Sequence, residues 1–529
     1  MKLKILYSSV DFLCPDLARV LKMEGNDLVL AQKDSDPDIL KGTLTRIPYS
    51  KRLDNLAQYD LVINDDNCNT DAVEARKLGV PAIGGDDKIK KMELDRKLAS
   101  KLAQACGLLV PEVIEVKDLE DAKKIIKERG GKWVLKQQGK LDGVKGLNYV
   151  AKMDNSEDVI SHIENLQEKW INEVKQEFIL QEKIEGYEMA IGSFWNSKTF
   201  QTDKEGNEVC EENWEHKSLF PGNLGQATGE QFTVQKMMKA QDSKLFKETL
   251  DKIRPALLKT DFRGDFDINT IVTEKGAYFL EFTPRMGVPA QSGLMSIQKT
   301  KWGEFLLRVA KGEPTELEYD PRWCIVSWLY TAPFPAIHEE KEIKGSVFEK
   351  VTNNISNSKG IKVLFKEKLT KEDWNNLHFD AVRFDGKDII VANSDGFILT
   401  ACGLGETVDE AGDKVEKLLK KMVVPKGFWR NDFHDTNYHK AKKDLIKWGY
   451  LPPEPEELED KEGEMEAETL VSKLKDAILM KSKDKISKEQ QKMIDGIKND
   501  YESKRENDKK EMAEELKKIK EAVRQIIYE

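Results

Sequence analysis

The residues best suited to chemistry lie in the segment GDFDINTIVTEKGAYFLEFTPRMG, positions 264–287. Asp267 and Asn269 are two residues apart, so in a β-strand their side chains share one face. After a Glu-Lys-Gly turn, Glu281 and Thr283 have the same spacing. If the two strands pair, oxygen ligands from both of them meet, and such ligands hold Mg²⁺ or Mn²⁺ against nucleotide phosphates. The segment therefore predicts a metal site for phosphate chemistry.

An acidic hairpin on the protein surface would show the same spacing of acids. The residues between the acids are apolar, which favours a buried strand pair; they are Phe266, Ile268, Phe279, Leu280 and Phe282. Acids inside a buried strand pair must be compensated by a partner. A metal ion is therefore the better interpretation of this pattern.

A loop rich in glycine and lysine lies upstream, in WVLKQQGKLDGVKGLNYV. A predicted strand carries Lys136, and the loop after it contains Gly139, Lys140, Gly143, Lys145 and Gly146. Such a loop can fold over phosphates, because backbone N–H groups and ammonium groups both approach the anion. A flexible surface hairpin would have the same composition, so the loop alone does not decide between the two.

A third candidate is the segment FILQEKIEGYEMAI. One predicted strand ends at Glu182, and Glu188 begins the next strand after Gly186. A carboxylate at that place can accept hydrogen bonds from the hydroxyl groups of a ribose.

These residues need a scaffold, and alternating strands and helices supply its first part. Strand and helix patterns follow one another at residues 4–8, 15–23, 27–31, 60–64, 71–78 and 80–83, which predicts an open parallel α/β sheet. Ligands of such sheets bind at the carboxyl ends of the strands, here residues 7–9, 64–67 and 84–86. The first of these loops, YSSVDF, has no glycine. Backbone N–H groups can still bind a phosphate there, but the glycine turn that allows close approach is missing.

The remaining chain divides into regions that differ in predicted secondary structure and in composition. A helix is predicted over residues 88–105, and strand patterns with antiparallel pairs follow at 133–137, 148–151, 178–182, 189–194, 264–272 and 277–282. After a small mixed region, PPEPEELEDKEGEMEAE reads as an extended acidic linker. In the last stretch the apolar residues Met512, Leu516, Ile519, Val523 and Ile526 have the spacing of a short coiled-coil seam. A solvated or docked helical tail and a helix that self-associates or binds a protein partner both fit this seam.

The order of these elements resembles the ATP-grasp superfamily of carboxylate-amine ligases, and within it the phosphoribosylamine-glycine ligases, also called glycinamide ribonucleotide synthetases. The resemblance runs from residue 4 to residue 435. It includes Glu215-His216-Lys217 followed by a glycine-threonine loop, GNLGQATGE at 222–230, and also DGFILTACGLGETVDEA at 395–411 and FWRND at 428–432. Each motif is short, but their common order along the chain is specific.

The resemblance implies an α/β and α+β multidomain protein. Its parts would be an N-terminal α/β substrate domain at 1–87, a two-lobed ATP-grasp domain at 88–319, a mixed C-terminal domain at 320–450, an acidic linker at 451–468 and a helical tail at 469–529. It also implies ATP and Mg²⁺ (or Mn²⁺) as cofactors, with a small-molecule carboxylate and an amine as substrates.

Carried over by position, the resemblance assigns roles to individual residues. ATP would be bound by Arg96, Lys136, Gly143, Lys145, Gly146, Glu182, Lys183, Ile184 and Glu188. The metal would be bound by Glu281 foremost, with Thr283, Asp267 and Asn269. The catalytic residues would be Arg285, His216 and Lys217, and a substrate would contact Gly225, Thr228, Gly229 and Arg285. In such ligases the γ-phosphoryl group of ATP activates the carboxylate, and positioning and charge neutralisation do most of the catalytic work.

The chain departs from the family pattern at several places. Thr283 stands where the family has Asn, so Asp267 or Asn269 would complete the metal site. Arg96 replaces a Lys, which keeps the charge but not the shape. Val288 replaces an acid, and the N-terminal glycine-rich phosphate loop is absent. ATP use is therefore better supported than phosphoribosylamine as the amine.

Two alternatives stay open beside a phosphoribosylamine-glycine ligase of purine biosynthesis. One is a ligase of the same mechanism with a different amine acceptor, which the glycine-free first loop favours. The other is a non-catalytic nucleotide-binding or structural protein with an interaction tail.

Composition limits the partners. The 529 residues include 85 Lys plus Arg and 95 Asp plus Glu, a formal charge of -10, so no global basic field favours nucleic acid. The sequence has no long apolar run and no signal-peptide pattern, and the six cysteines lack metal-ligand spacing. We therefore expect a cytoplasmic protein with reduced, buried thiols and neither a nucleic-acid nor a membrane partner.

Overall fold

The first strands of the computed structural model form a five-stranded parallel sheet in the order β3-β2-β1-β4-β5. Its elements are β1 (Lys4–Ser9), α1 (Pro15–Met23), β2 (Asp27–Gln32), β3 (Thr45–Arg46), β4 (Leu61–Ile63), α2 (Asp71–Lys77) and β5 (Ala82–Ile83). Strand order reverses at β1, which lies between β2 and β4, so the crevice where such sheets bind ligands is beside the ends of β1 and β4. The predicted parallel α/β sheet is confirmed, whereas β3 is too short to leave a pattern in the sequence.

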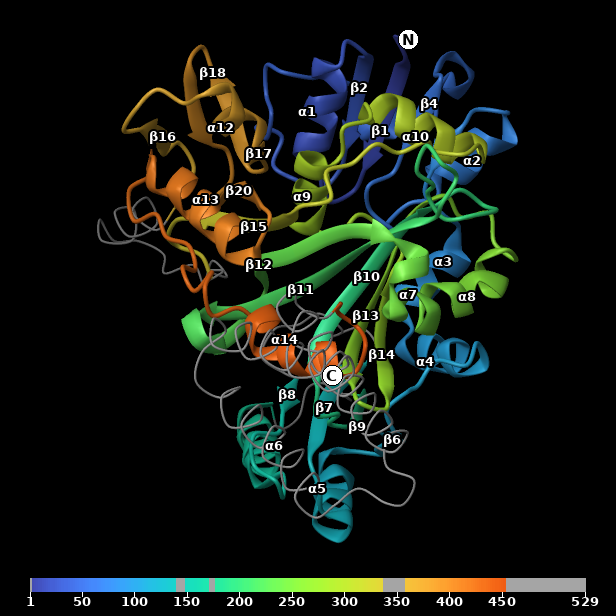
Figure 1. Ribbon diagram of the computed structural model, residues 1–529, viewed down its shortest axis with the longest axis vertical. Helices are drawn as coiled ribbons and strands as arrows, with labels where there is room; N and C mark the ends of the chain where they lie inside the picture. Colours follow the sequence, from blue (N-terminus) through green and yellow to red (C-terminus); the bar gives the residue numbers. More distant parts are fainter. Residues whose placement is uncertain (1, 139–147, 171–176, 336–356, 453–529) are drawn as a thin grey trace, which may run out of the picture. The chain divides into compact units, whose positions relative to one another are not determined.

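Helices cover this sheet. Ile5, Leu6 and Tyr7 of β1 are fully buried, as expected for a parallel strand with both faces covered. α1 and α10 (Trp302–Lys311) lie against the sheet, and α10 comes from much later in the chain (Figure 1).

The structure describes residues 2–138, 148–170, 177–335 and 357–452. Gly143, Lys145 and Gly146 of the predicted phosphate loop lie outside these residues, as do nearly all of the acidic linker and the whole helical tail. Residues 1–450 form one compact unit.

An eight-stranded antiparallel sheet follows, in the order β14-β13-β10-β11-β12-β15-β20-β17. Its strands are β10 (Tyr187–Trp195), β11 (Val209–Phe220), β12 (Leu224–Lys239), β13 (Gly264–Thr273), β14 (Gly276–Thr283), β15 (Trp323–Tyr330), β17 (Leu377–Phe379) and β20 (Phe397–Gly405). Because β15 pairs with β12, strands from both sides of residue 320 share this sheet. Pairing between distant strands leaves no trace in the sequence pattern, and the limits drawn between the three domains remain a prediction.

A smaller sheet stands beside the large one, in the order β6-β9-β7-β8. Its elements are β6 (Val113–Glu115), α5 (Leu119–Arg129), β7 (Trp133–Gln138), β8 (Tyr149–Val150), α6 (Glu157–Trp170) and β9 (Glu177–Glu182). Trp133, Leu135 and Leu180 pack in one core with residues of α5 and α6. Since side chains alternate along a strand, Lys136 and Gln181 point to the other face of this sheet.

The C-terminal part adds a four-stranded sheet, β18-β19-β16-β21. Its strands are β16 (Lys362–Phe365), β18 (Val382–Asp385), β19 (Asp388–Val391) and β21 (Met422–Val423). The remaining helices are α3 (Asp87–Leu94), α4 (Arg96–Ala105), α7 (Lys244–Glu248), α8 (Leu250–Leu257), α9 (Ala290–Ile297), α12 (Lys371–Asn375), α13 (Val408–Lys420) and α14 (Asn437–Lys447).

Three local predictions differ from the structure. The helix expected over 88–105 is broken at Asp95, whose side chain caps α4 by accepting the N–H of Leu98 at 2.9 Å. The glycine-threonine segment at 222–230 is not a loop throughout, because β12 begins at Leu224 and pairs with β11. All six cysteines are free, but Cys68 is exposed and Cys106 is only partly buried.

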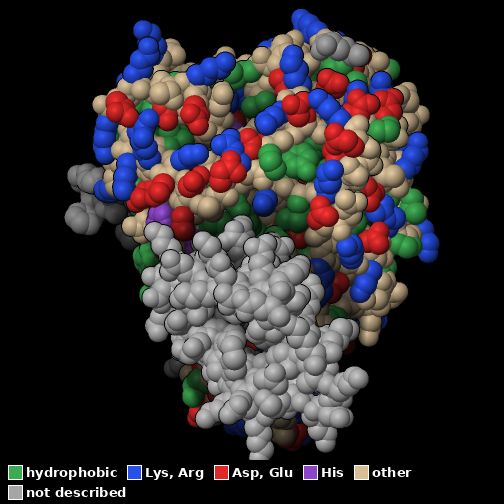
Figure 2. Space-filling view, viewed as in Figure 1, with side chains coloured by type: hydrophobic (Ala, Val, Ile, Leu, Met, Phe, Trp, Pro, Cys, Tyr) green, Lys and Arg blue, Asp and Glu red, His purple; other side chains and the backbone are tan. Residues whose placement is uncertain are grey.

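The described surface carries charges of both signs. Figure 2 shows Lys and Arg side chains interspersed with Asp and Glu on the visible described face, with no large patch of one sign. Among the described residues, no helix is both long enough and apolar enough to cross a membrane.

Candidate active site

A cavity of about 870 Å³ lies between the large sheet and the small one. β11 to β14 line it on one side, and β8 and α6 line it on the other. The predicted site residues that line it are Arg96, Lys217, Gly225, Gly229, Asp267, Asn269, Glu281, Thr283 and Arg285. The fold thus brings residues predicted to bind ATP, the metal and the substrate into one space.

The proposed metal ligands face one another across two paired strands. Asn269 of β13 lies opposite Glu281 of β14, and Asp267 lies opposite Thr283. The amide nitrogen of Asn269 is 3.4 Å from Oε1 of Glu281. Oδ1 of Asp267 is buried and has no hydrogen-bond partner among the described residues.

This donor set fits an ion that arrives with a nucleotide. Within the described ranges, no three His, Cys, Asp or Glu side chains are arranged to hold a metal by themselves. Mg²⁺ is usually bound through one or two carboxylates, with phosphate oxygens and water completing its shell. Glu281 with Asn269 or Asp267 would supply the protein's share of such a site.

Positive charge surrounds Glu281. Burial by itself would raise the pKa of this carboxyl group, but Lys217, Arg96 and Lys136 lower it below the ordinary value. A guanidinium nitrogen of Arg96 lies 3.8 Å from Oε2 of Glu281, and 42% of the Glu281 side chain is exposed. The lowered pKa means that this carboxylate is ionised. Because Glu281 also lines the cavity, an incoming cation can reach it.

Lys217 connects the cavity to two further carboxylates. Its Nζ lies 2.5 Å from Oε1 of Glu188 and 2.6 Å from Oε2 of Glu215. Burial would lower the pKa of Lys217, but these two acids hold it well above its ordinary value. Glu188, predicted to bind ribose, does not line the cavity itself and reaches it through this ion pair.

A second cavity, of about 340 Å³, adjoins the first at Arg96, which lines both. Lys136 of β7, Gln181 of β9 and Leu280 of β14 also line it. A slot between two sheets, with apolar residues and a cation, suits a nucleotide base and its phosphates. Burial and the nearby Arg96 lower the pKa of Lys136 to about 8.

Three of the residues predicted to bind ATP lie at the edge of this second cavity. Glu182, Lys183 and Ile184 follow Gln181 directly but do not line the cavity. Nζ of Lys183 is 3.2 Å from Glu185. The strand β9 therefore contributes Gln181 to the slot, and the contact of residues 182–184 with ATP stays a prediction.

The break between α3 and α4 positions two arginines. Arg96 becomes the first residue of α4 because Asp95 caps that helix. Glu93, near the end of α3, accepts a hydrogen bond from Nε of Arg285 at 2.8 Å. One helix break therefore presents Arg96 to both cavities and orients Arg285 at the larger one.

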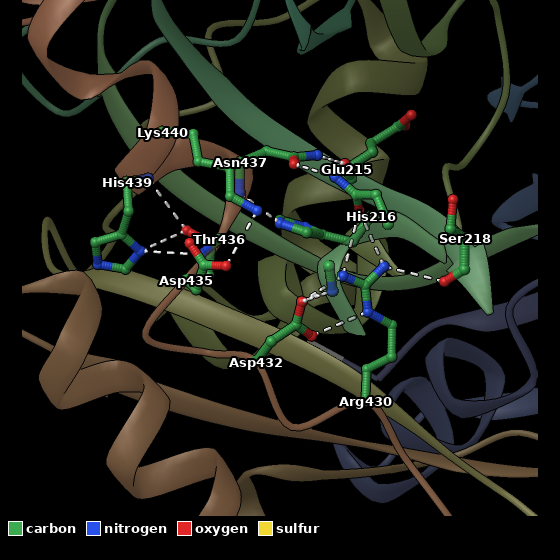
Figure 3. A network of polar contacts seen from close by, with 12 residues as sticks. Glu215, His216, Ser218, Arg430, Asp432, Asp435, Thr436, Asn437, His439 and Lys440 are labelled. Carbon is green, nitrogen blue, oxygen red and sulfur yellow. Dashed lines mark hydrogen bonds and ion pairs between the residues drawn. The ribbon is translucent and has the colours of Figure 1, made fainter. Parts of the chain in front are cut away.

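His216, predicted to be catalytic, lies behind the cavity. It is 1% exposed, and Nε2 accepts the backbone N–H of Asn437 at 2.7 Å. The side chain of Asn437 donates to the carbonyl of Glu215 at 2.7 Å, so the start of α14 is bound to β11 at two neighbouring residues (Figure 3). His216 and Lys217 alternate along β11, which explains why only Lys217 reaches the cavity.

Arg430 is a positioning residue for which sequence analysis gave only a motif. Its guanidinium group is 2% exposed, lies 2.6 Å from Asp432, and donates to the carbonyl of Ser218 at 3.0 Å (Figure 3). Asp432 in turn accepts the N–H of Gly222 at 3.0 Å. The FWRND segment therefore fixes the β11–β12 hairpin that carries Lys217.

Some residues of the glycine-threonine segment at 222–230 line the large cavity, and others hold the neighbouring strand. Gly225 and Gly229 line the large cavity, whereas Thr228 does not. Thr228 is 4% exposed and donates through Oγ1 to the carbonyl of Lys217 at 3.2 Å. It supports the β11 strand rather than contacting the cavity.

Two acids beside the proposed metal ligand Asp267 were not identified from the sequence, Asp265 and Glu211. A side chain at Gly192 would meet Oδ2 of Asp267 at 3.2 Å, Oε2 of Glu211 at 3.6 Å and Oδ1 of Asp265 at 3.7 Å. Burial raises the pKa of all three carboxyl groups, that of Asp265 to about 7. The spacing of Asp265 from Asp267 was a signal available in the sequence, but β11, which carries Glu211, was not predicted as a strand.

Comparisons with known proteins agree with this geometry. Residues 95–291 match the family described as "Phosphoribosylglycinamide synthetase, ATP-grasp (A) domain". A phosphoribosylamine-glycine ligase of Clostridium acetobutylicum is 24% identical over 28% of this chain and 36% of its own length. The same enzyme of Halalkalibacterium halodurans is 21% identical over 67% of this chain and 76% of its own. The matched segment thus spans only about a third of the first relative.

Solved structures show a similar fold. Phosphoribosylamine-glycine ligase of Thermotoga maritima has a TM-score of 0.59 at 17% identity, over 81% of this chain and 99% of its own. The biotin carboxylase domain of Hydrogenobacter thermophilus 2-oxoglutarate carboxylase, solved with MgADP, ADP and bicarbonate, has a TM-score of 0.55 at 14% identity, over 86% and 100%. Residues 95–291 are therefore similar to the ATP-grasp domain of phosphoribosylglycinamide synthetases, and most of the chain has the fold of these solved structures.

Proposed function

We propose that this protein is an ATP- and Mg²⁺-dependent ligase that joins a carboxylate to an amine through an acyl phosphate. One observation carries the proposal: the ionised, open carboxylate of Glu281 lies among Lys217, Arg96 and Lys136 where two sheets face one another. Such a cluster of cations around a metal-binding carboxylate is what a triphosphate requires.

Nucleotide binding would use residues of both sheets. The base would occupy the slot lined by Gln181 and Leu280, and Arg96 and Lys136 would neutralise phosphate oxygens. Glu281 and Asn269 would hold Mg²⁺, which when bound reduces the charge of the triphosphate and orients it.

The reaction needs two displacements. A carboxylate oxygen of the substrate attacks the γ-phosphorus, the bond to the bridging oxygen breaks, and ADP leaves. The amine nitrogen then attacks the carbonyl carbon of the acyl phosphate, inorganic phosphate leaves, and the nitrogen loses a proton. Arg285 would bind the carboxylate or the departing phosphate, and Lys217 would stabilise charge on the transferred group.

The relatives suggest the first substrates to test. Glycine and phosphoribosylamine are the substrates that the name of these relatives gives, and they would place this chain in purine biosynthesis. A cytoplasmic location and a role of residues 469–529 in self-association or protein binding belong to the same proposal.

Hydroxylamine provides a test that does not depend on the natural amine, because it traps acyl phosphates as hydroxamates. We expect ATP- and Mg²⁺-dependent hydroxamate and ADP formation with at least one carboxylate of an amino-acid panel. Glu281→Gln should lower this rate about 100-fold while the protein stays folded by circular dichroism. Glu274→Gln, an exposed acid in the turn of the same hairpin, is the matched control and should keep full activity. Equal rates in the two variants would refute the role of Glu281, and a carboxylate-independent ADP release would refute the ligase.

A further inference from the structure

The loop after β1 is where an open parallel sheet with this strand order binds a phosphate group. In this chain its donors are already used. The backbone N–H groups of Val10 and Asp11 donate to Oδ2 of Asp66 at 2.5 and 3.0 Å. The hydroxyl of Ser9 donates to the same oxygen at 2.8 Å. Two successive amides and a hydroxyl form an anion-binding nest, and a carboxylate of the protein fills it.

Two further N–H groups of the loop are paired as well. The N–H of Phe12 donates to Oγ of Ser9 at 2.7 Å, and the N–H of Cys14 donates to Oδ2 of Asp65 at 2.9 Å. Pro15 begins α1 and has no N–H. The start of this helix therefore has one N–H donor fewer for an external anion.

The charges of the loop oppose a phosphate in addition. Asp66 is 4% exposed, and its other oxygen accepts the N–H of Cys68 at 3.0 Å. Asp65 is fully buried beside it, and burial together with Asp66 raises its pKa to about 7. A phosphate would have to displace a carboxylate that accepts four hydrogen bonds and then lie against a second acid.

The loop after β4, which carries Asp66 and Asn67, is linked to the larger cavity by hydrogen bonds. Nδ2 of Asn67 donates to Oε2 of Glu93 at 3.3 Å, and Oε1 of Glu93 accepts from Arg285 at 2.8 Å. Arg285 lines the cavity. The loop that carries Asp66 is therefore two contacts away from Arg285, the residue proposed to bind the activated carboxylate.

We propose that the amine acceptor of this ligase carries no phosphate group, because Asp66 occupies the nest that would bind one. The inference rests on the proposed ligase function and narrows its substrate to an unphosphorylated amine. Amines that are neutral or positively charged thus become better candidate substrates than phosphoribosylamine, the amine in the name of the curated relatives.

Matched acceptor pairs test the inference on the active enzyme. With a carboxylate that supports hydroxamate formation, kcat/KM is compared for ribosylamine and phosphoribosylamine, ethanolamine and O-phosphoethanolamine, and glucosamine and glucosamine 6-phosphate. We expect amide formation only with unphosphorylated members, and at least a tenfold preference in any pair that reacts. A preference for the phosphorylated member overturns the inference but leaves the ligase intact, whereas failure of the hydroxamate assay itself counts against the ligase.

A binding test stands independently of activity. Hydrogen exchange of the amides of residues 10–14 is measured with and without ribose 5-phosphate, in the presence of MgADP. We expect no protection in the wild-type protein, and new protection in Asp66→Gly, whose empty nest can accept the phosphate. Asp60→Gly is the control. Asp60 precedes β4, at the amino-terminal ends of the strands and away from the nest, and its side chain accepts the N–H of Lys4 at 2.8 Å.

The wild-type measurement decides the matter even if Asp66→Gly does not fold. Protection of residues 10–14 by ribose 5-phosphate in the wild-type chain would show that Asp66 yields to a phosphate, and the inference would be wrong. Unchanged exchange supports the filled nest.

Discussion

The backbone N–H of Asn437 donates to Nε2 of His216, 221 positions away along the chain, at 2.7 Å. The same ring stacks on Phe232 with centroids 3.8 Å apart, and burial lowers the pKa of His216 to about 3. An imidazole that serves as an acceptor for a buried amide is unavailable to take a proton from an amine. The bond makes His216 a connector between β11 and α14.

His216→Phe should therefore cost stability rather than chemistry. The ring keeps its stacking but leaves the N–H of Asn437 without an acceptor, which should lower the free energy of unfolding by about 1–3 kcal/mol. The shape of the pH–rate profile should stay the same. A large loss of rate in a variant of unchanged stability would contradict this.

The same residue predicts a pH dependence of stability. The folded pKa of about 3 lies below the ordinary 6.5, so between these values the unfolded state binds more protons and His216 destabilises the fold as pH falls. Urea unfolding at pH 5 and pH 7.5 should show a smaller loss on acidification in His216→Phe than in the wild type.

Arg430→Lys should loosen the β11–β12 hairpin. Lys keeps the charge but cannot contact Asp432, Ser218 and Asn223 at once, as the planar guanidinium group does. We expect a loss of about 2–4 kcal/mol in the free energy of unfolding, because the group is buried, and faster hydrogen exchange at residues 217–224.

Arg322→Lys is the matched control for that substitution. Arg322 pairs with Asp320 at 2.8 Å, also two residues away, but is 35% exposed. Its replacement should change stability little. Equal effects of the two substitutions would show that burial and the carbonyl contact of Arg430 do not matter.

Lys136 should make nucleotide affinity depend on pH. Since burial and Arg96 lower its pKa to about 8, Lys136 loses its charge as pH rises through that value. The affinity for MgADP should be nearly constant below the pKa and about tenfold weaker one unit above it. Calorimetry across this range measures the effect.

Lys136→Met should bind MgADP weakly at every pH and lose this dependence. Lys132→Met is the control, because Lys132 precedes the same strand and its ammonium group pairs with Asp154 and Glu185 instead of lining a cavity. An unchanged pH dependence in Lys136→Met would assign the titration to another group.

Asp65 gives a stability effect of the opposite sign to that of His216. Burial and Asp66 raise its pKa to about 7 from 3.8, so the folded state binds the extra proton. Its contribution is fully present below 3.8 and is lost as pH rises through 7. The unfolding free energy of the wild type relative to Asp65→Asn should therefore fall by about 3 kcal/mol between pH 4 and pH 8, as denaturant titration can measure.

The sequence by itself determined the parts of this protein that depend on near neighbours. Asp267 and Asn269 share a face because strands alternate with period two, and the Glu-Lys-Gly turn lets their strand pair with the strand that carries Glu281. The turn alone would place Leu280 opposite Asn269, and a bulge between Asn269 and Thr270 brings Glu281 there instead. The order of motifs predicted the ATP-grasp fold, and the parallel sheet followed from alternating strands and helices.

Only the tertiary structure decided which side chains reach the cavity. His216 does not line the cavity, and its ring accepts the N–H of Asn437. Arg96 lines both cavities because Asp95 ends one helix and caps the next. The donors of the loop after β1 are occupied because they bind Asp66, which is 56 residues from Val10 along the chain. These outcomes depend on contacts between distant segments, which periodicity and spacing do not encode. A hydrogen bond forms only when folding has brought the acceptor within about 3 Å of the donor.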